Sequence, residues 1–317
     1  MKTAVEQLED RMQQQLGAVL FGMADAIHGL CVALVAQGHV LLEGPPGLGK
    51  TLLAKSLAQL LQGEFKRIQC TADMMPSDLT GIHVFDKQSN SFKLLPGPLF
   101  ADVVLVDEIN RTGPKTQSSL LQAMEEGAIT LDRKTYQLPQ DFLLLASQNP
   151  FDFEGVYPLP ESQLDRFLLR LQIDYPGVDT EMEVLRHYDA PGGGHFEHQA
   201  SLTALPTDLL SRAREQVTGV HVSEGLYRYV AEIARASRSE PRLSLGLSTR
   251  GALALMRCAR VEAACRSRDY VVPDDVKYIA PSITAHRFVL TPEAALEGID
   301  CVQVYSDIAA RVPAPRD

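Results

Sequence analysis

The sequence lacks the features that mark secreted, disulfide-linked or membrane-spanning proteins. Only five cysteines occur among 317 residues, and none belongs to a CxxC pair. An odd number of scattered cysteines without metal-ligand spacing fits free thiols in a reducing compartment better than a disulfide framework. No apolar run reaches the length of a membrane span, and the polar N-terminal segment of mixed charge does not have the pattern of a signal peptide. We therefore expect a cytoplasmic protein with no membrane span.

An excess of basic charge is also absent. The formal net charge is −10, so the summed field repels nucleic-acid phosphates and anionic membranes. Nucleic acid is therefore not an expected partner. Hydrophobic residues make up 45% and charged residues 22% of the chain, which is typical of a globular protein. The length fits two domains.

The apolar pattern changes along the chain from a helical to an alternating α/β type. Residues 1–38 carry apolar positions at three- and four-residue spacing, which predicts helices. Short apolar runs separated by helical or irregular stretches follow and predict a doubly wound parallel sheet of five strands. These runs lie at residues 39–43, 65–70, 103–107, 142–147 and 168–173.

The loop after the first predicted strand matches the phosphate-binding pattern GxxxxGK[ST] in full. Its glycines let backbone N–H groups surround phosphate oxygens, and the helix expected at Lys50–Leu61 directs the positive end of its dipole at the same anion. We predict that Lys50 contacts the β- and γ-phosphates and that Thr51 offers its hydroxyl to Mg²⁺. The predicted cofactors are ATP and Mg²⁺. The loop residues predicted to bind them are Gly44, Pro45, Pro46, Gly47, Leu48, Gly49, Lys50, Thr51 and Leu52.

Polar side chains follow two further predicted strands. Asp107 and Glu108 end a buried run, at the strand end where α/β sheets place their sites. We predict that Asp107 holds Mg²⁺ through water and that Glu108 orients and deprotonates the attacking water. Asn149 ends the next run and is predicted to hydrogen-bond the γ-phosphate or the water; the alternative is a strand-ending Asn before proline. Lys50, Glu108 and Asn149 are thus catalytic candidates.

Two segments interrupt the α/β alternation. Ile82–Leu95 and Ile129–Leu138 each have the pattern of strand, polar turn and strand, which predicts two hairpins. One interpretation is a surface hairpin without a role, and the other is an insertion that moves with the nucleotide state.

The composition divides the chain into two domains. We expect an α/β nucleotide-binding domain with an N-terminal helix over 1–190, a Gly-rich linker over 191–200 and a small all-α domain over 201–317. Cys258 and Cys265, seven residues apart, are expected to share a buried helix face.

Three longer stretches resemble the signature segments of MoxR-type AAA+ ATPases. They are GHVLLEG at 38–44, DEINR at 107–111, and QNP at 148–150 followed by EGVYPLPESQLDRF at 154–167. The resemblance covers most of the chain. It implies a P-loop AAA+ α/β fold with hairpin inserts and a small all-α lid, and Mg²⁺-dependent ATP hydrolysis in a homo-oligomeric, hexameric ring.

The resemblance also implies roles for two arginines. Arg166, in Leu-Asp-Arg-Phe, matches the catalytic arginine finger that reaches the γ-phosphate held by a neighbouring subunit. Arg250 matches the sensor-2 arginine at the start of a lid helix, which couples the lid to the bound nucleotide. The alternative for each is an ordinary structural arginine.

One segment departs from the family pattern. Phe21-Gly22-Met23 stands where relatives have a Val-Gly-Gln-like segment near the adenine. Gly22 and Met23 are still expected at the base, because a methionine packs against a base as well as the stem of a glutamine does. The two hairpins match the helix-2 insert and the pre-sensor-1 hairpin of the family.

The resemblance implies partners and leaves alternatives open. Members generally act with a protein that bears a von Willebrand factor A (VWA) domain, and they remodel or mature client protein complexes. A DNA-translocating or helicase-like motor is disfavoured because acids accompany the bases at the hairpin tips, where Lys87 stands beside Asp86 and Arg133-Lys134 follows Asp132. A nucleotide switch that does not hydrolyse ATP would usually lack the water-activating acid or the finger, and both are present.

Overall fold

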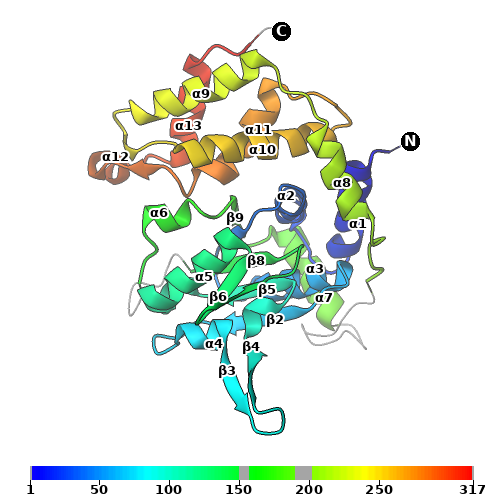
Figure 1. Ribbon diagram of the computed structural model, residues 1–317. Helices are drawn as coiled ribbons and strands as arrows, with labels where there is room; N and C mark the ends of the chain where they lie inside the picture. The colour runs from blue at the N-terminus through cyan, green and yellow to red at the C-terminus, as the bar shows by residue number, and fades with distance from the viewer. Residues whose placement is uncertain (1, 150–156, 190–201, 316–317) are drawn as a thin grey trace.

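The computed structural model describes residues 2–149, 157–189 and 202–315 and consists of an α/β part below a helical part in Figure 1. Two helices, α1 (Ala4–Gly17) and α2 (Ala24–Val35), form the N-terminal region, as its apolar spacing predicts. A capping box starts α1: the Thr3 hydroxyl accepts from the Glu6 N–H, and the Glu6 carboxylate accepts from the Thr3 N–H. No helix in the described part of the chain combines the length and the apolar character needed to cross a bilayer.

A five-stranded parallel sheet in the order β2-β5-β8-β1-β9 forms the centre of the α/β part. The strands are β1 (Val40–Glu43), β2 (Phe65–Gln69), β5 (Val103–Asp107), β8 (Leu143–Gln148) and β9 (Leu169–Gln172). All five strands predicted from the apolar runs are confirmed. Because β1 lies between β8 and β9, and β5 lies beside β8, the carboxyl ends of β1, β5 and β8 face the same edge.

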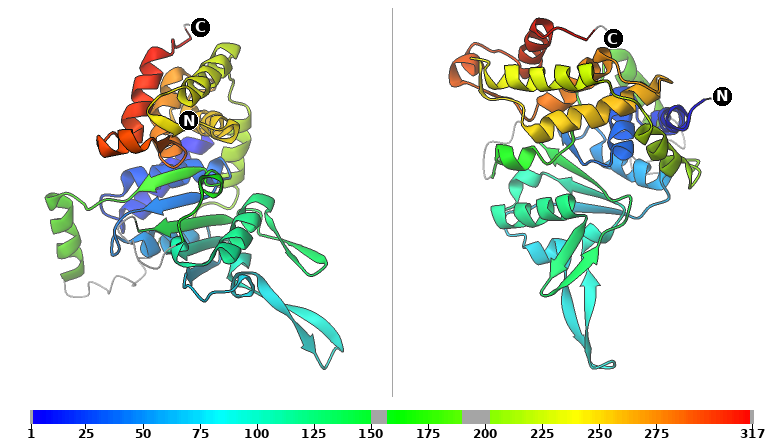
Figure 2. Two further views of the ribbon diagram at one scale, coloured as in Figure 1. Left: turned by 90° about the vertical axis from the view of Figure 1, so that its left-hand side faces the viewer. Right: turned by 45° about the horizontal axis from the view of Figure 1, so that its top comes forward.

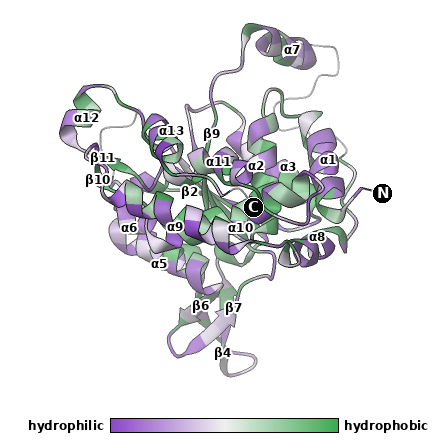
Figure 3. Cartoon of the chain, turned by 90° about the horizontal axis from the view of Figure 1, so that it is seen from above, coloured by the Kyte–Doolittle hydropathy of each residue, from purple (hydrophilic) through white to green (hydrophobic). Residues whose placement is uncertain are grey.

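Helices cover both faces of the sheet. Helix α3 (Lys50–Leu60) packs on one face and α5 (Pro114–Glu126) on the other. The α/β part also contains α4 (Pro76–Thr80), α6 (Glu161–Leu164) and α7 (Val178–Asp189). One apolar cluster joins α1, α2 and α3 to the sheet and to the helical part, and a second joins α5 to the other face. Seen from above, α7 stands away from the body, and none of its side chains is buried (Figure 3).

Both predicted hairpins are present. They pair β3 (Gly81–Asp86) with β4 (Ser91–Pro96), and β6 (Ala128–Leu131) with β7 (Lys134–Gln137). The β3–β4 hairpin extends far from the α/β part (Figure 2). His83 joins the two hairpins, because its ring nitrogens lie 2.8 Å from an Asp132 carboxylate oxygen and 2.9 Å from the Tyr136 hydroxyl.

The C-terminal part is helical, as predicted. Its helices are α8 (Leu209–Thr218), α9 (Glu224–Arg238), α10 (Thr249–Cys265), α11 (Pro273–Thr284), α12 (Pro292–Leu296) and α13 (Cys301–Arg311). One short antiparallel pair, β10 (Leu243–Leu245) with β11 (Val289–Leu290), is an addition that the helical spacing did not predict. The predicted linker at 191–200 lies outside the described residues, so the domain boundaries stay a prediction.

A buried arginine connects the two parts. Arg287 is only 4% exposed, and its guanidinium donates to the Asp165 carboxylate at 2.6 Å and to the Phe167 carbonyl at 2.6 Å. The same carboxylate accepts from the hydroxyl of Ser248, the residue that caps α10, at 2.9 Å. Asp165 therefore ties the end of α6 to two elements of the helical part.

Candidate nucleotide-binding site

The glycine-rich loop runs from β1 into α3 and takes backbone conformations that a side chain would disfavour. Gly49, directly before α3, has φ +80°, in the left-handed region. At Gly44 a Cβ would lie 2.0 Å from the Ile173 carbonyl oxygen, because the chain after β9 approaches the loop closely. These positions need glycine, and the first N–H groups of α3 have no partner within the helix.

Lys50 is the first residue of α3, at the end of this loop. Its ammonium donates to the Gly44 carbonyl at 2.5 Å. Burial lowers the pKa of Lys50, while the charges of Asp107, Glu108 and Glu43 act in the opposite direction. The lysine is thus a partly desolvated cation that faces three acids and can bind a phosphate strongly.

A cavity of about 730 Å³ lies where the loop meets the carboxyl ends of β5 and β8. It brings together most of the residues predicted for the phosphates, the metal and the water. Those lining it are Pro46, Gly47, Gly49, Lys50, Thr51, Leu52, Asp107, Glu108 and Asn149. The predictions placed these side chains on three strand ends, and the parallel sheet unites them at one edge.

Asp107 is buried and already has two partners. Its carboxylate accepts from the Ser147 hydroxyl at 2.9 Å and from Arg67 Nε at 2.7 Å. The Ser147 oxygen in turn accepts from the Glu108 N–H at 3.0 Å. Ser147 therefore fixes both acids relative to β8.

Glu108 has a left-handed backbone, with φ 56°, which is uncommon for a residue other than glycine. Its carboxylate accepts from Gln69 Nε2 at 3.0 Å and lies 3.0 Å from Arg111 Nε. Strained conformations of this kind gather at functional sites. The turn at Glu108 directs the carboxylate into the cavity.

Sequence reasoning missed Ser147, Arg67 and Gln69 as members of this site. Arg67 and Gln69 lie two residues apart on β2, so they project from the same face of the sheet. This spacing indicates that the two side chains share a face of the sheet, but it does not show which residues they contact. Only the pairing of β2 with β5, which sets Gln69 opposite Asp107, places them beside the acids.

A second cavity of about 620 Å³ lies on the other side of the loop. Gly22, Met23 and Leu48 line it, together with loop residues that also line the first cavity. The Met23 methyl carbon lies 3.3 Å from the place where a Cβ of Gly49 would be. The segment predicted to lie near the base is therefore next to the phosphate loop. Gly44 and Pro45 do not line either cavity.

The two predicted arginines lie elsewhere. Arg166 Nη1 is 3.4 Å from a carboxylate oxygen of Glu125 on α5, and Arg250, the second residue of α10, pairs with the other oxygen of that carboxylate. Neither arginine lines the two cavities. Residues 150–156, within the stretch that resembles the family signature, lie outside the described residues.

Comparison with known proteins gives two family matches. Residues 39–169 match the ATPase family associated with various cellular activities (AAA), and residues 235–308 match the AAA lid domain. Together they span the phosphate loop, both acids, both hairpins, Arg166 and Arg250.

Individual relatives cover nearly the whole chain. The chain is 42% identical to the uncharacterized protein YeaC of Bacillus subtilis, over 95% of this chain and 93% of that protein. It is 36% identical to chaperone MoxR1 of Mycobacterium tuberculosis, over 94% of this chain and 80% of that protein. A crystal structure of a candidate ATPase from Cytophaga hutchinsonii superposes with a TM-score of 0.87 at 35% identity and covers 99% of this chain and 97% of that one.

Proposed function

The chain belongs to the MoxR family of AAA ATPases, and on this premise we propose that it hydrolyses ATP with Mg²⁺ in a ring of identical subunits. We propose further that hydrolysis drives the remodelling or maturation of a client protein complex, together with a VWA-domain partner. The observation that carries the proposal is the single cavity in which Lys50, Asp107 and Glu108 meet at the phosphate loop.

The residues present fit a magnesium ion. The Thr51 hydroxyl and the Asp107 carboxylate line the same cavity and are oxygen ligands of the kind that Mg²⁺ prefers. When bound there, Mg²⁺ neutralises charge on the phosphate oxygens. Lys50 and the loop N–H groups hold the same oxygens from the other side.

Glu108 and Asn149 serve the attacking water in this proposal. A carboxylate within hydrogen-bond reach orients the water and accepts its proton. The hydrogen bond from Gln69 and the ion pair with Arg111 hold the Glu108 side chain in place. Asn149 lines the cavity at the end of β8 and supplies an amide for the γ-phosphate or the water.

Arg166 and Arg250 support the ring. Both guanidinium groups meet at Glu125 and are absent from the lining of this chain's own cavities. We propose that both reach the nucleotide of a neighbouring subunit. A guanidinium supplied from a second subunit stabilises the charge that spreads over the transferring phosphoryl group.

The surface supports a protein client. The β3–β4 hairpin exposes apolar side chains at Ile82, Val84, Phe85, Phe92 and Leu95. Exposed apolar patches mark contacts with other proteins. On the same hairpin Lys93 pairs with Asp86, so its basic charge is offset rather than presented to a phosphate backbone. One relative, MoxR1, is named a chaperone.

The test is ATPase turnover per subunit as a function of protein concentration, in the wild type and in Arg166→Ala. We expect turnover to rise with concentration as subunits assemble, and to fall by about 10³-fold or more in Arg166→Ala. Arg228→Ala, on an exposed lid side chain, is the matched control and retains full turnover. Turnover that stays flat while the protein passes from monomer to oligomer contradicts the ring and the role of Arg166.

A further inference from the structure

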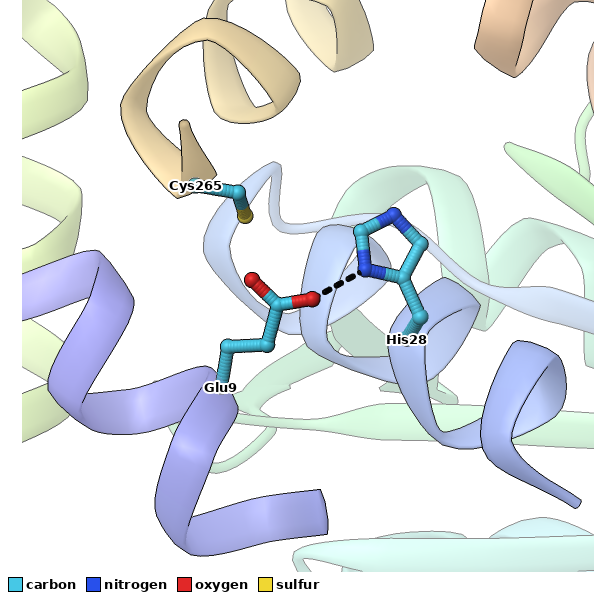
Figure 4. Close-up of side chains that lie close together, drawn as sticks. All are labelled: Glu9, His28 and Cys265. Carbon is cyan, nitrogen blue, oxygen red and sulfur yellow. Dashed lines mark hydrogen bonds and ion pairs between the residues drawn. The ribbon is translucent and has the colours of Figure 1, made fainter. Parts of the chain in front are cut away.

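A second group of polar side chains lines neither nucleotide cavity and lies where α1, α2 and the end of α10 meet. Figure 4 shows Glu9, His28 and Cys265 facing one another from these three helices. A carboxylate oxygen, a ring nitrogen and the thiol sulfur all lie within 4.8 Å of one another. The three side chains line a cavity of about 310 Å³. One oxygen, one nitrogen and one sulfur donor thus converge on a single space.

His28 is oriented from both sides. Its Nδ1 lies 2.5 Å from Glu9 Oε1, and its Nε2 lies 2.7 Å from Glu262 Oε1. The Glu262 side chain is only 1% exposed. In metal sites one nitrogen of a histidine binds the ion, while the other donates its proton to a carboxylate that fixes the ring. Glu262 occupies that second position.

We propose that Glu9, His28 and Cys265 bind a zinc-class divalent transition metal, with Glu262 as the carboxylate that orients His28. Zn²⁺ accepts mixed sulfur, nitrogen and oxygen ligands, and sites with three protein ligands leave one position for water. Mg²⁺ and Ca²⁺ prefer oxygen donors alone, so the thiol and imidazole select against them. Tetrahedral zinc ligands lie about 3.3–3.8 Å apart, so the donor atoms must shift by about 1 Å. Glu9 Oε1 and His28 Nδ1 lie 2.5 Å apart and must separate, whereas the more distant donors must approach, and both shifts are within the range of small side-chain rotations.

The charges around the cluster suit a cation. A Glu9 carboxylate and a Cys265 thiolate together neutralise a divalent ion. Arg266 lies 3.2 Å from Glu262 and 2.7 Å from Asp275, so the orienting carboxylate is itself compensated. The ring of Tyr278 meets the His28 ring edge-on, with centroids 5.7 Å apart, and covers one side of the cluster.

The position links two parts of the chain. Glu9 and His28 belong to the N-terminal helices, and Cys265 is the last residue of α10, whose second residue is Arg250. A bound ion would therefore clamp the helix that presents Arg250 onto α1 and α2. No spacing pattern in the sequence indicates this cluster, because its three ligands are far apart along the chain.

Cobalt binding to the full chain, stripped of metal and kept free of nucleotide and magnesium, tests the proposal. We expect one Co²⁺ per chain with a thiolate-to-cobalt charge-transfer band. Cys265→Ser removes the band, whereas Cys301→Ser, which changes another partly buried cysteine on a lid helix, keeps it. Absence of the band in the wild type, or its survival in Cys265→Ser, overturns the proposal.

Two further measurements remain decisive if a variant folds poorly. In the wild type, Zn²⁺ slows alkylation of Cys265, followed by peptide mass spectrometry; an unchanged rate contradicts the site. Glu262→Gln weakens Co²⁺ affinity by about 10- to 100-fold and keeps the charge-transfer band, because it alters the orienting carboxylate and leaves the ligands intact. Unchanged affinity in Glu262→Gln contradicts the role of this carboxylate.

Discussion

Arg166 and Arg250 form ion pairs with the two oxygens of one carboxylate, that of Glu125 on α5. One arginine follows α6 in the α/β part, and the other lies in the first turn of α10 in the helical part. The shared partner holds both guanidinium groups at one place on the surface. Any phosphate that recruits them must compete with Glu125.

Glu125→Gln removes that competition. An exposed ion pair contributes less than about 1 kcal/mol, so we expect turnover at limiting protein concentration to rise by about two- to fivefold. The measurement is the ATPase rate against protein concentration. Glu126→Gln is the matched control. The Glu126 carboxylate is the next one along α5 and accepts a hydrogen bond from Gln122, so this substitution should leave the curve unchanged. A fall in turnover in Glu125→Gln would mean that this carboxylate positions the arginines for catalysis.

Lys50→Ala and Glu108→Gln test ATP binding and ATP hydrolysis separately. The lysine ammonium is a partly buried cation at the phosphate loop, and its loss should weaken ATP binding by about 10- to 100-fold or more. Glu108→Gln retains the shape of the side chain and loses the base, so affinity stays and turnover falls by about 10²- to 10⁴-fold. Titration with a fluorescent ATP analogue and a steady-state assay measure the two effects. Lys115→Ala, on the exposed side of α5, serves as the control. Equal affinity in Lys50→Ala and wild type contradicts the phosphate-binding role.

Asp165→Asn tests the contact between the α/β part and the lid. The substitution leaves the Arg287 guanidinium buried without its carboxylate, and we expect a loss of about 3–5 kcal/mol in the free energy of unfolding. Asp208→Asn removes an exposed ion pair with Arg212 and should change this energy by less than about 1 kcal/mol. Denaturant unfolding of both variants measures the difference. Equal, small changes would mean that Arg287 finds sufficient compensation in backbone carbonyls.

The stability of the protein should fall in mild acid because of His39. Burial lowers the pKa of His39 from 6.5 to about 4; its Nδ1 accepts from the Leu144 N–H at 3.0 Å, so its Nε2 donates to the Met124 carbonyl. The neutral ring therefore stabilises the fold fully above pH 6.5, and this contribution is lost as the pH falls towards 4. Over that range the loss amounts to about 3 kcal/mol.

Denaturant unfolding at several pH values between 7 and 4 checks this expectation. His39→Gln should flatten the pH dependence, whereas His221→Gln, at an exposed position, should retain the slope of the wild type. His286 is buried as well, with its pKa lowered in the same direction, so part of the slope remains in His39→Gln. An unchanged slope in His39→Gln contradicts the assignment.

Much of the fold could be predicted because its signals are local. The central strands of the sheet are short apolar runs, and β5 is buried along its entire length. The hairpins follow from strand, turn and strand within 16 residues or fewer of sequence. The antiparallel pair β10–β11 was not predicted, because its partners are short and lie on either side of α10 and α11.

The candidate site also has a part that could be predicted from the sequence and a part that could not. The loop from Gly44 to Thr51 is one contiguous pattern, and the acids follow a buried strand directly. The partners that hold those acids could not be predicted, because Arg67 and Ser147 reach Asp107 only through the order β2-β5-β8. Hydrophobic patterning shows that a strand is buried, and it does not show which strand lies beside it.

The sequence by itself determined the phosphate loop, the strand-end acids and the alternation of strands and helices, because each depends on residues a few positions apart. Only the tertiary structure decided which distant side chains meet. Glu125 holds Arg250 from 125 residues away, and Glu262 reaches His28 across 234 residues. Five scattered cysteines gave no metal pattern, yet the packing of α1, α2 and α10 sets one of them beside a histidine and a carboxylate. These contacts follow from how helices and strands pack, and the spacing of residues a few positions apart does not encode that packing.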